Sequence, residues 1–162
     1  MRRAAAGFTL IELMVVMVLI GVLVSMVHIS LGDNNSRNAR QEADVLLGLI
    51  HGLREKAVLE GQEYGLRLEP GAYQLMRFEG EQWQAVEPRV SLPVGLVLAL
   101  TLDGQDQPLT AGSVTPQLLW LSSDENTAFE LHFDSPPQRW RSIVSDGLAD
   151  AVIDVPEPRH ES

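Results

Sequence analysis

The chain has 162 residues and a mass of 17.9 kDa, which suits one modest domain plus an N-terminal segment. It carries 22 acidic and 12 basic residues, a formal net charge of −10. Such a surface repels phosphate backbones, so no nucleic acid is expected as a partner. There is no cysteine, which excludes disulfides, thiolate metal ligands and cysteine nucleophiles.

The N-terminal segment is strongly apolar but contains one carboxylate. From Phe8 to Leu31 the only residue charged at neutral pH is Glu12, and residues 13–24 are apolar apart from Gly21. An ionisable side chain at the centre of a bilayer costs about 2.5–3.5 kcal/mol on insertion scales. A carboxylate in such a segment is therefore a functional hypothesis by default.

Two general interpretations leave Glu12 unexplained. A secretory signal peptide has an apolar stretch of about 7–15 residues followed by a small-residue cleavage site, whereas the stretch here is longer and ends in HISLGDNN. A plain transmembrane anchor fits better, since about 20 apolar residues span a bilayer. Arg2 and Arg3 would then hold the N-terminus in the cytoplasm and place the rest of the chain outside.

The stretch GFTLIELMVVMVLIGVL, which begins at Gly7 and follows a short basic leader, suggests a third interpretation. It resembles the processing site of the type IV pilin and type II secretion pseudopilin families. The resemblance implies that a prepilin peptidase cuts between Gly7 and Phe8 and N-methylates Phe8. Residues 1–7 would then be a cleaved leader and residues 8–31 a transmembrane and assembly helix. Loss of Arg2 and Arg3 would leave a mature net charge of −12.

Under this interpretation Glu12 has a physical role. Cleavage creates a cationic amine on Phe8, and positions i and i+4 share a helix face, so Glu12 can pair with that amine. When helices stack with an axial offset, Glu12 can instead reach the amine of a neighbouring subunit. Such pairing in a low dielectric sets register even where its net stability is small. We expect Glu12 to be an assembly contact; the alternative is a carboxylate that snorkels near a helix end.

Beyond Leu31 the pattern predicts that the helix continues over residues 32–61, outside the membrane in the periplasm. Gly32, Asp33 and the following Asn pair favour a break or bend near the membrane surface. Apolar residues then recur at helical spacing up to about Glu60, at Ala43, Leu46, Leu47, Ile50, Leu53, Ala57 and Val58.

From Tyr64 the pattern changes to an alternation of period 2, which is typical of antiparallel strands. Strands are predicted over residues 64–69, 72–80, 81–87, 91–104, 117–123, 128–134, 139–146 and 150–155, with a loop of Gln, Asp and Pro after Gly104. Residues 62–155 form a β-rich globular domain in this prediction, and residues 156–162 a polar tail. A helix covered by one or two antiparallel sheets buries both apolar patterns. The predicted fold class is α+β and pilin-like: a long N-terminal helix packed by its second half on antiparallel sheet.

Two stretches of the globular region narrow the resemblance. Residues 46–84 are similar to the helix-to-sheet junction of the GspH family of minor pseudopilins, with the strand GLRL followed by a Tyr-bearing and a Trp-bearing strand. Residues 119–133, LWLSSDENTAFELHF, resemble a later strand–loop–strand unit of that family. The loop at residues 122–126 lacks the proline and glycine often found there, which leaves its conformation open.

This resemblance implies a structural subunit of the periplasmic pseudopilus of a type II secretion system, which exports folded proteins through the outer membrane. The implied partners are the prepilin peptidase, the major pseudopilin, other minor pseudopilins, the inner-membrane platform and inner-membrane lipid. The implied location is the bacterial inner membrane, crossed once, with the N-terminus cytoplasmic and the domain periplasmic. A minor pilin of a type IV pilus, FimT/FimU-like, is the closest alternative. A membrane-anchored periplasmic enzyme is the third.

Residues that could support catalysis or bind a metal are scattered. Glu130, His132 and Asp134 alternate along one predicted strand and could share a face, but the solvent face of an antiparallel sheet has the same pattern. Two acidic pairs, Asp103 with Asp106 and Asp124 with Glu125, have the composition of calcium-binding loops. They lack a recognisable calcium-binding spacing, so we interpret them as solvated turns. The tryptophans are expected in the core. We therefore predict no catalytic residue, no cofactor and no metal.

Overall fold

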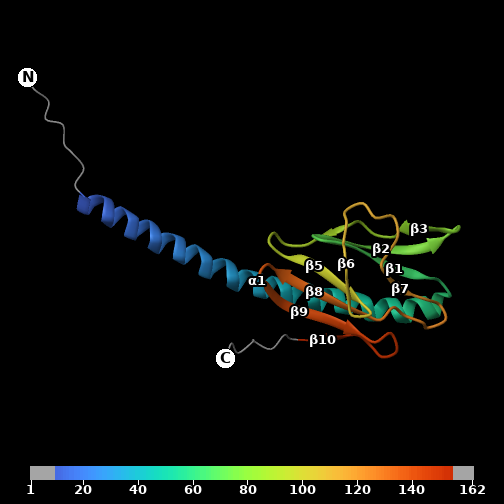
Figure 1. The fold of residues 1–162 in the computed structure, drawn as a ribbon. Coiled ribbons are helices and arrows are strands. Elements are labelled where there is room, and N and C mark those ends of the chain that lie inside the picture. Colours follow the sequence, from blue (N-terminus) through green and yellow to red (C-terminus); the bar gives the residue numbers. More distant parts are fainter. Residues whose placement is uncertain (1–9, 155–162) are drawn as a thin grey trace, which may run out of the picture. The chain divides into compact units, whose positions relative to one another are not determined.

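The computed structural model describes residues 10–154, except for the side chains of residues 24–33. The chain divides into two units, Met1–Asn34 and Asn35–Ser162, each described here by itself. One helix, α1, spans Leu10–Glu60 and contributes to both (Figure 1).

The backbone is helical without interruption through residues 32–35, so a break at Gly32 is not found in the described helix. Gly, Asp and Asn disfavour a helix by at most about 1 kcal/mol each, and flanking helical residues override such a preference.

The C-terminus of α1 is where the pattern predicts it. The helix ends at Glu60, and Gly61 follows with a positive φ of 61°. The amide of Gln62 donates to the carbonyl of Ala57 at 3.2 Å. A glycine with positive φ directly after the last turn is a common helix stop, because it satisfies a free carbonyl without a Cβ clash.

The second unit contains two antiparallel sheets of five strands each. The first, sheet A, has the order β3-β2-β1-β7, and β4 also pairs with β2. Its strands are β1 (Tyr64–Glu69), β2 (Ala72–Glu79), β3 (Gln82–Ala85), β4 (Val90–Ser91) and β7 (Leu118–Trp120). The second, sheet B, has the order β10-β9-β8-β5-β6. Its strands are β5 (Val97–Leu102), β6 (Gln105–Gln107), β8 (Phe129–Ser135), β9 (Gln138–Ser145) and β10 (Val152–Asp154). The predicted α+β class is confirmed.

Two short strands depart from the prediction. The segment Gln105–Gln107, predicted as a loop, is β6 and pairs with the end of β5. The predicted strand at 91–104 divides into β4 and β5, because a turn closed by the Leu96 amide and the Pro93 carbonyl at 3.1 Å interrupts it. Both short strands are exposed edge pieces without alternating apolar residues, so the period-2 pattern does not reveal them.

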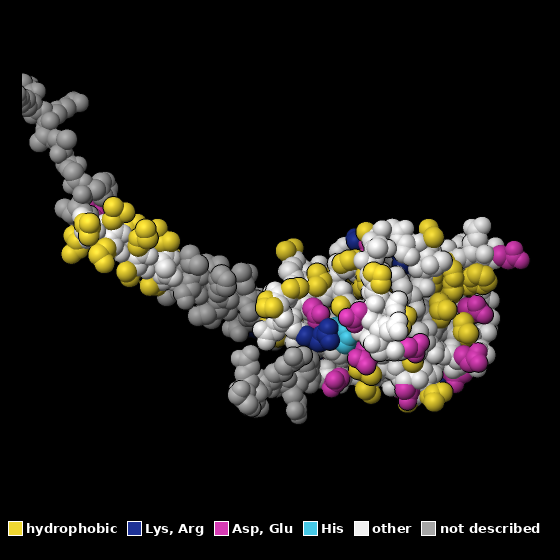
Figure 2. Space-filling model, in the orientation of Figure 1, with side chains coloured by type: hydrophobic (Ala, Val, Ile, Leu, Met, Phe, Trp, Pro, Cys, Tyr) yellow, Lys and Arg dark blue, Asp and Glu magenta, His cyan; other side chains and the backbone are white. Residues whose placement is uncertain are grey.

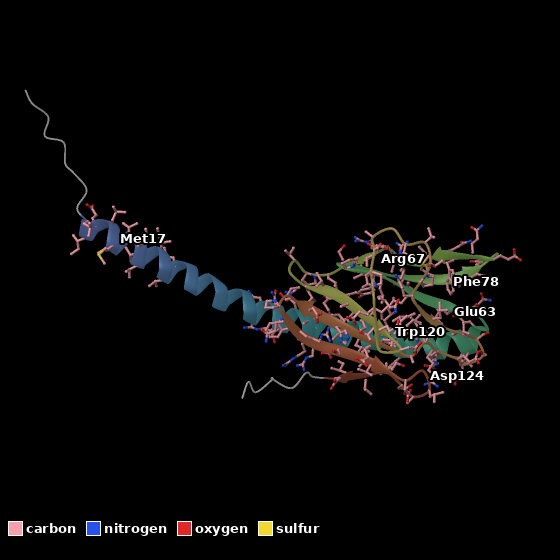
Figure 3. All side chains as sticks on the ribbon, in the orientation of Figure 1. Met17, Glu63, Arg67, Phe78, Trp120 and Asp124 are labelled. Atoms are coloured by element: carbon pink, nitrogen blue, oxygen red, sulfur yellow. The ribbon has the colours of Figure 1, made fainter. Side chains whose placement is uncertain are left out.

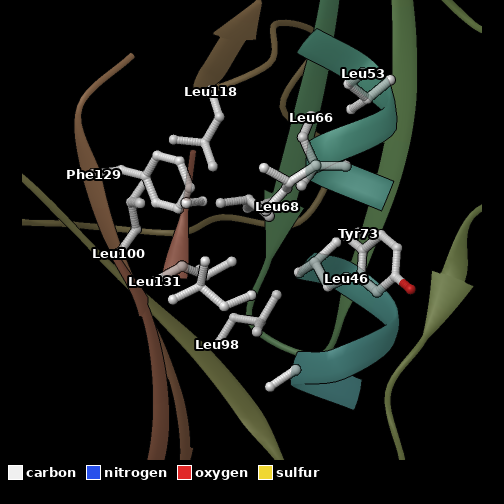
Figure 4. Packing of buried hydrophobic residues seen from close by; sticks show 14 of the residues in the cluster. Leu46, Leu53, Leu66, Leu68, Tyr73, Leu98, Leu100, Leu118, Phe129 and Leu131 are labelled. Carbon is white, nitrogen blue, oxygen red and sulfur yellow. The ribbon is translucent and has the colours of Figure 1, made fainter. Parts of the chain in front are cut away.

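The core lies between one face of α1 and the inner faces of both sheets (Figure 4). The buried helix positions are Ala39, Ala43, Leu46, Ile50, Leu53 and Ala57. Two predicted positions differ: Leu47 is partly buried, and Val58 is 45% exposed because it lies about 100° around the helix from the buried Ala57. All buried hydrophobic residues in the described part fall between Ala39 and Ala151. Residues 35–162 therefore contain a complete core.

Candidate functional site

The predicted processing and assembly residues lie at the start of the chain. Gly7 and Phe8 fall outside the described residues, whereas Glu12 lies in the first turn of α1 and is exposed. A carboxylate in the first turn is favoured by the free amides and the positive end of the helix dipole. Glu12 is the only charged residue among the described side chains of residues 10–23.

Around Glu12 the helix surface is apolar. Every large hydrophobic side chain from Leu10 to Leu23 is exposed, from 43% at Val16 to 79% at Leu10. Figure 2 shows these side chains in yellow along the first part of α1. Isolated exposed apolar residues are ordinary, but a continuous surface of this kind marks a site for lipid or protein.

The described residues include no helix that is long and apolar enough to cross a membrane. The predicted transmembrane helix, residues 8–31, includes Phe8, Thr9 and residues 24–31, whose positions or side chains lie outside the described part.

His132 is not on a solvated face, contrary to the interpretation favoured for its strand. Its side chain is 5% exposed, and its ring nitrogens lie 2.8 Å from Ser142 Oγ and 3.2 Å from Thr101 Oγ1. Thr101 donates to Asp106 at 2.9 Å, so its oxygen can accept from Nε2–H while Nδ1 accepts from Ser142. Desolvation by burial, followed by the charge of Arg139, lowers the pKa of His132.

A neutral His132 therefore links β5, β8 and β9, and it is too buried to meet a substrate. Glu130, on the same strand, is exposed and lies 3.9 Å from the ring. Asp134 pairs with Arg139 at 3.1 Å instead. Within the described ranges no three His, Cys, Asp or Glu side chains are placed to hold a metal ion.

The two acidic pairs lie in turns. Asp103 and Gly104 have φ of 50° and 74° between β5 and β6, as in a two-residue hairpin turn. In the loop that lacks proline and glycine, Asp124 itself has a φ of 69°, and the Leu121 amide donates to the Glu125 carbonyl at 2.9 Å. Asp tolerates positive φ better than most residues, so Asp124 supplies the conformation that a glycine would.

An arginine of α1 holds this loop, which the sequence did not predict. Arg54 donates to both carboxylate oxygens of Asp124, at 2.9 and 3.2 Å, and to Asp150 at 3.2 Å. The hydrogen bond from Arg54 lowers the pKa of Asp124. One helix position thus fixes the loops β7–β8 and β9–β10. The residues are 70 and 96 positions apart, so no local pattern could pair them.

A second unpredicted network lies on the outer face of sheet A. Glu69, with a side chain only 7% exposed, accepts from Arg89 at 2.8 and 3.0 Å and lies 3.6 Å from Arg67. Arg67 also donates to the Ser113 carbonyl at 2.9 Å. The hydrogen bond from Arg89 lowers the pKa of Glu69. The network holds the segment between β6 and β7 against the sheet.

The tryptophans take three different positions. Trp120 is buried in the core, as predicted, and meets Phe129 edge-on at 6.5 Å between ring centroids. Trp140 is partly buried and packs on the core. Trp83 lies half-buried on the outer face of sheet A, 5.3 Å from the ring of Phe78.

Comparison with known proteins finds similarity both to the N-terminal segment and to the fold of the chain. Residues 2–27 match the prokaryotic N-terminal methylation motif. Solved structures share the fold: the minor pseudopilin EpsH of the Vibrio cholerae type II secretion system has a TM-score of 0.65 at 24% identity, covering 76% of this chain and 97% of that one. The solution structure of Escherichia coli GspH has a TM-score of 0.61 at 16% identity, covering 78% of this chain and 94% of that one.

The sequence relatives are closer. Type II secretion system protein H of Pseudomonas aeruginosa is 43% identical over 161 residues, which cover 90% of this chain and 94% of the relative. The protein of the same name in Aeromonas hydrophila is 28% identical, with 80% and 81% covered. This similarity favours type II secretion over the type IV pilus alternative. The chain therefore belongs to the type II secretion system protein H family.

Proposed function

We propose that this chain is a minor pseudopilin that is cleaved between Gly7 and Phe8 by a prepilin peptidase, methylated on Phe8, and assembled through its N-terminal helix into a periplasmic pseudopilus. The observation that carries the proposal is the continuous apolar surface of residues 10–23, interrupted among the described side chains only by Glu12. Such a surface needs lipid before assembly and protein afterwards. The methylation motif over residues 2–27 supports the processing step.

Glu12 sets the register of assembly in this proposal. The mature N-terminus lies four residues before Glu12, so the new amine and the carboxylate can share one helix face. In an apolar surrounding, an uncompensated charge is costly, and the pairing of both charges removes that cost. The terminal amine of a neighbouring subunit can also pair with the Glu12 carboxylate, but only when the two helices are shifted along their axes by one particular distance.

The remaining parts of the proposal concern location and partners. The chain crosses the inner membrane once, with residues 32–61 and the β-rich domain in the periplasm. There it joins the major pseudopilin, other minor pseudopilins and the inner-membrane platform in the export of folded proteins. We also propose that it is not an enzyme, since the buried, hydrogen-bonded His132 supports a structural role for the residues that could have formed an acid–base site.

The mass of the mature chain tests the processing step. We expect a species that begins at Phe8 and carries one added methyl group, in cells with an active prepilin peptidase. The same chain in cells without the peptidase is the control and should keep Met1. An intact Met1 terminus in the presence of active peptidase would refute the proposal.

A further inference from the structure

The domain carries twice as many acidic as basic residues, yet some of its arginines form no ion pair with the acidic side chains that the structure describes. Residues 35–154 contain nine basic and eighteen acidic residues. Six of these basic residues have a described partner. Five of the six are ion-paired, and the sixth, Lys56, lies over the ring of Tyr64, 5.0 Å from its centroid. Among the side chains that the structure describes, no ion pair or hydrogen bond is formed by Arg37, Arg40 or Arg141.

These three arginines lie at one end of the domain, which we call the arginine end. Arg37 and Arg40 are exposed on α1, just after Asn35, whose side chain donates to Ser135 at 2.8 Å. Ser135 closes the β8–β9 hairpin, and Arg141 follows on β9 opposite Phe133. Figure 2 shows dark-blue side chains at this end of the domain, with magenta side chains beside them.

The opposite end of the domain is acidic. There α1 ends, and the amide of Phe78 donates to the carbonyl of Glu63 at 2.9 Å. Phe78, Glu63 and Asp124 mark this end in Figure 3. Helix residues 35–60 separate the two ends by about 39 Å. At physiological ionic strength the Debye length is about 8 Å, so the acidic end does not cancel the field at the arginine end.

The position of the arginine end in the chain indicates its partner. Arg37 follows Leu31, the last residue of the predicted membrane segment, by six residues, which reach at most about 20 Å. Positive residues within about 15–20 residues of a span oppose export of that side of the chain. Two arginines here therefore carry a topological cost, which a contact with the membrane surface would explain.

We propose that the arginine end binds the phosphate headgroups of anionic phospholipids on the membrane surface from which the helix emerges, before assembly. Guanidinium groups bind phosphate oxygens in a bidentate manner. No described carboxylate is ion-paired with these three arginines, although the exposed Asp44 lies one helical turn from Arg40. The contact orients the unassembled domain and is given up when the subunit leaves the membrane. This inference rests on the membrane orientation in the proposed function.

Vesicle sedimentation of residues 35–162, which contain the whole core, tests the proposal. We expect binding to phosphatidylcholine vesicles that contain roughly one third phosphatidylglycerol, no binding to phosphatidylcholine alone, and loss of binding at high salt. Each arginine near an anionic surface is worth about a fivefold change in affinity, so the Arg37→Gln/Arg40→Gln variant should bind about twenty-five-fold more weakly. Both side chains are exposed, and an unchanged melting temperature would show that the fold is intact.

The matched control, Lys56→Gln/Arg77→Gln, removes two positive charges from the acidic end. It has the same net charge as the Arg37→Gln/Arg40→Gln variant and should retain wild-type binding. Equal losses in both variants, or equal binding to neutral and anionic vesicles, would overturn the proposal. Displacement by inorganic phosphate at constant ionic strength would assign the arginines to free phosphate instead. If the Arg37→Gln/Arg40→Gln variant still bound vesicles but no longer captured another pseudopilin, the arginines would bind a protein instead, and the proposal would be overturned. None of these results depends on cleavage at Gly7, which the mass of the full chain reports separately.

Discussion

The two parts of α1 show how one helix can serve two purposes. Between residues 10 and 23 apolar side chains cover the helix surface and all are exposed, whereas in the domain one face of the helix carries a buried apolar stripe from Ala39 to Ala57. This stripe has a partner within the chain, and mostly polar residues cover the rest of the helix. A helix that is apolar on all sides needs an apolar surrounding from outside. In the proposed function this difference separates the part of the helix that assembles from the part that folds.

The largest expected effect comes from the only charge in the first part. Glu12→Leu should leave membrane insertion intact or improve it, but should lower the assembled fraction more than tenfold, because breaking a buried ion pair costs about 3–5 kcal/mol. Cross-linking of the variant to the major pseudopilin measures the effect. Met14→Leu, an apolar exchange on the same helix, is the control. Normal assembly and secretion in the Glu12 variant would leave a snorkelling carboxylate as the explanation.

In the second part, the effect of a substitution should be on folding. Leu46→Ala removes a buried side chain at the centre of the helix–sheet core and should lower the free energy of unfolding by about 2–5 kcal/mol. Chemical denaturation of residues 35–162 measures the loss. Val45→Ala, next to it but 55% exposed, should change stability by less than about 1 kcal/mol. A similar loss in both variants would contradict the described orientation of the helix.

A smaller effect is expected at the network on sheet A. Glu69→Gln leaves Arg67 and Arg89 without their shared carboxylate and should cost about 1–3 kcal/mol in unfolding free energy. The pKa of Glu69 is lowered in the folded state, so its contribution is present above the unfolded pKa of about 4.3 and is lost as pH falls through the folded value. Denaturation between neutral and acidic pH should show that the variant and wild type converge at low pH. A constant difference would show that the charge is not responsible.

The smallest expected effect is a pH dependence from His132. Its pKa is lowered from 6.5 by burial, so the folded state prefers the neutral ring. Stability is therefore present above pH 6.5 and falls as the pH drops toward the folded pKa. Melting temperatures of wild type and His132→Gln across this window measure the effect. An unchanged slope in the variant would show that another group titrates.

The prediction succeeded where sequence and structure share a local period. Helical spacing located the buried face of α1, and alternation located β1, β2, β8 and β9, because each pattern reflects the face that a residue presents. It failed for β6, whose Gln-Asp-Gln segment pairs through its backbone alone. It also failed for Arg54 with Asp124 and Asp150, since a charge cannot be paired with a partner 70 or more residues away before the fold is known. The resemblance located Gly7 and Phe8, and these positions remain predictions.

The complete core within residues 39–151 has a consequence for how the subunit moves. In the proposed function the subunit passes from bilayer to filament, and this passage changes the surroundings of residues 10–23. None of the core contacts described here involves those residues, so the exchange requires no unfolding. The energetic balance between membrane and filament can thus be tuned by substitutions in the first helical turns, while the domain keeps a constant shape for its neighbours.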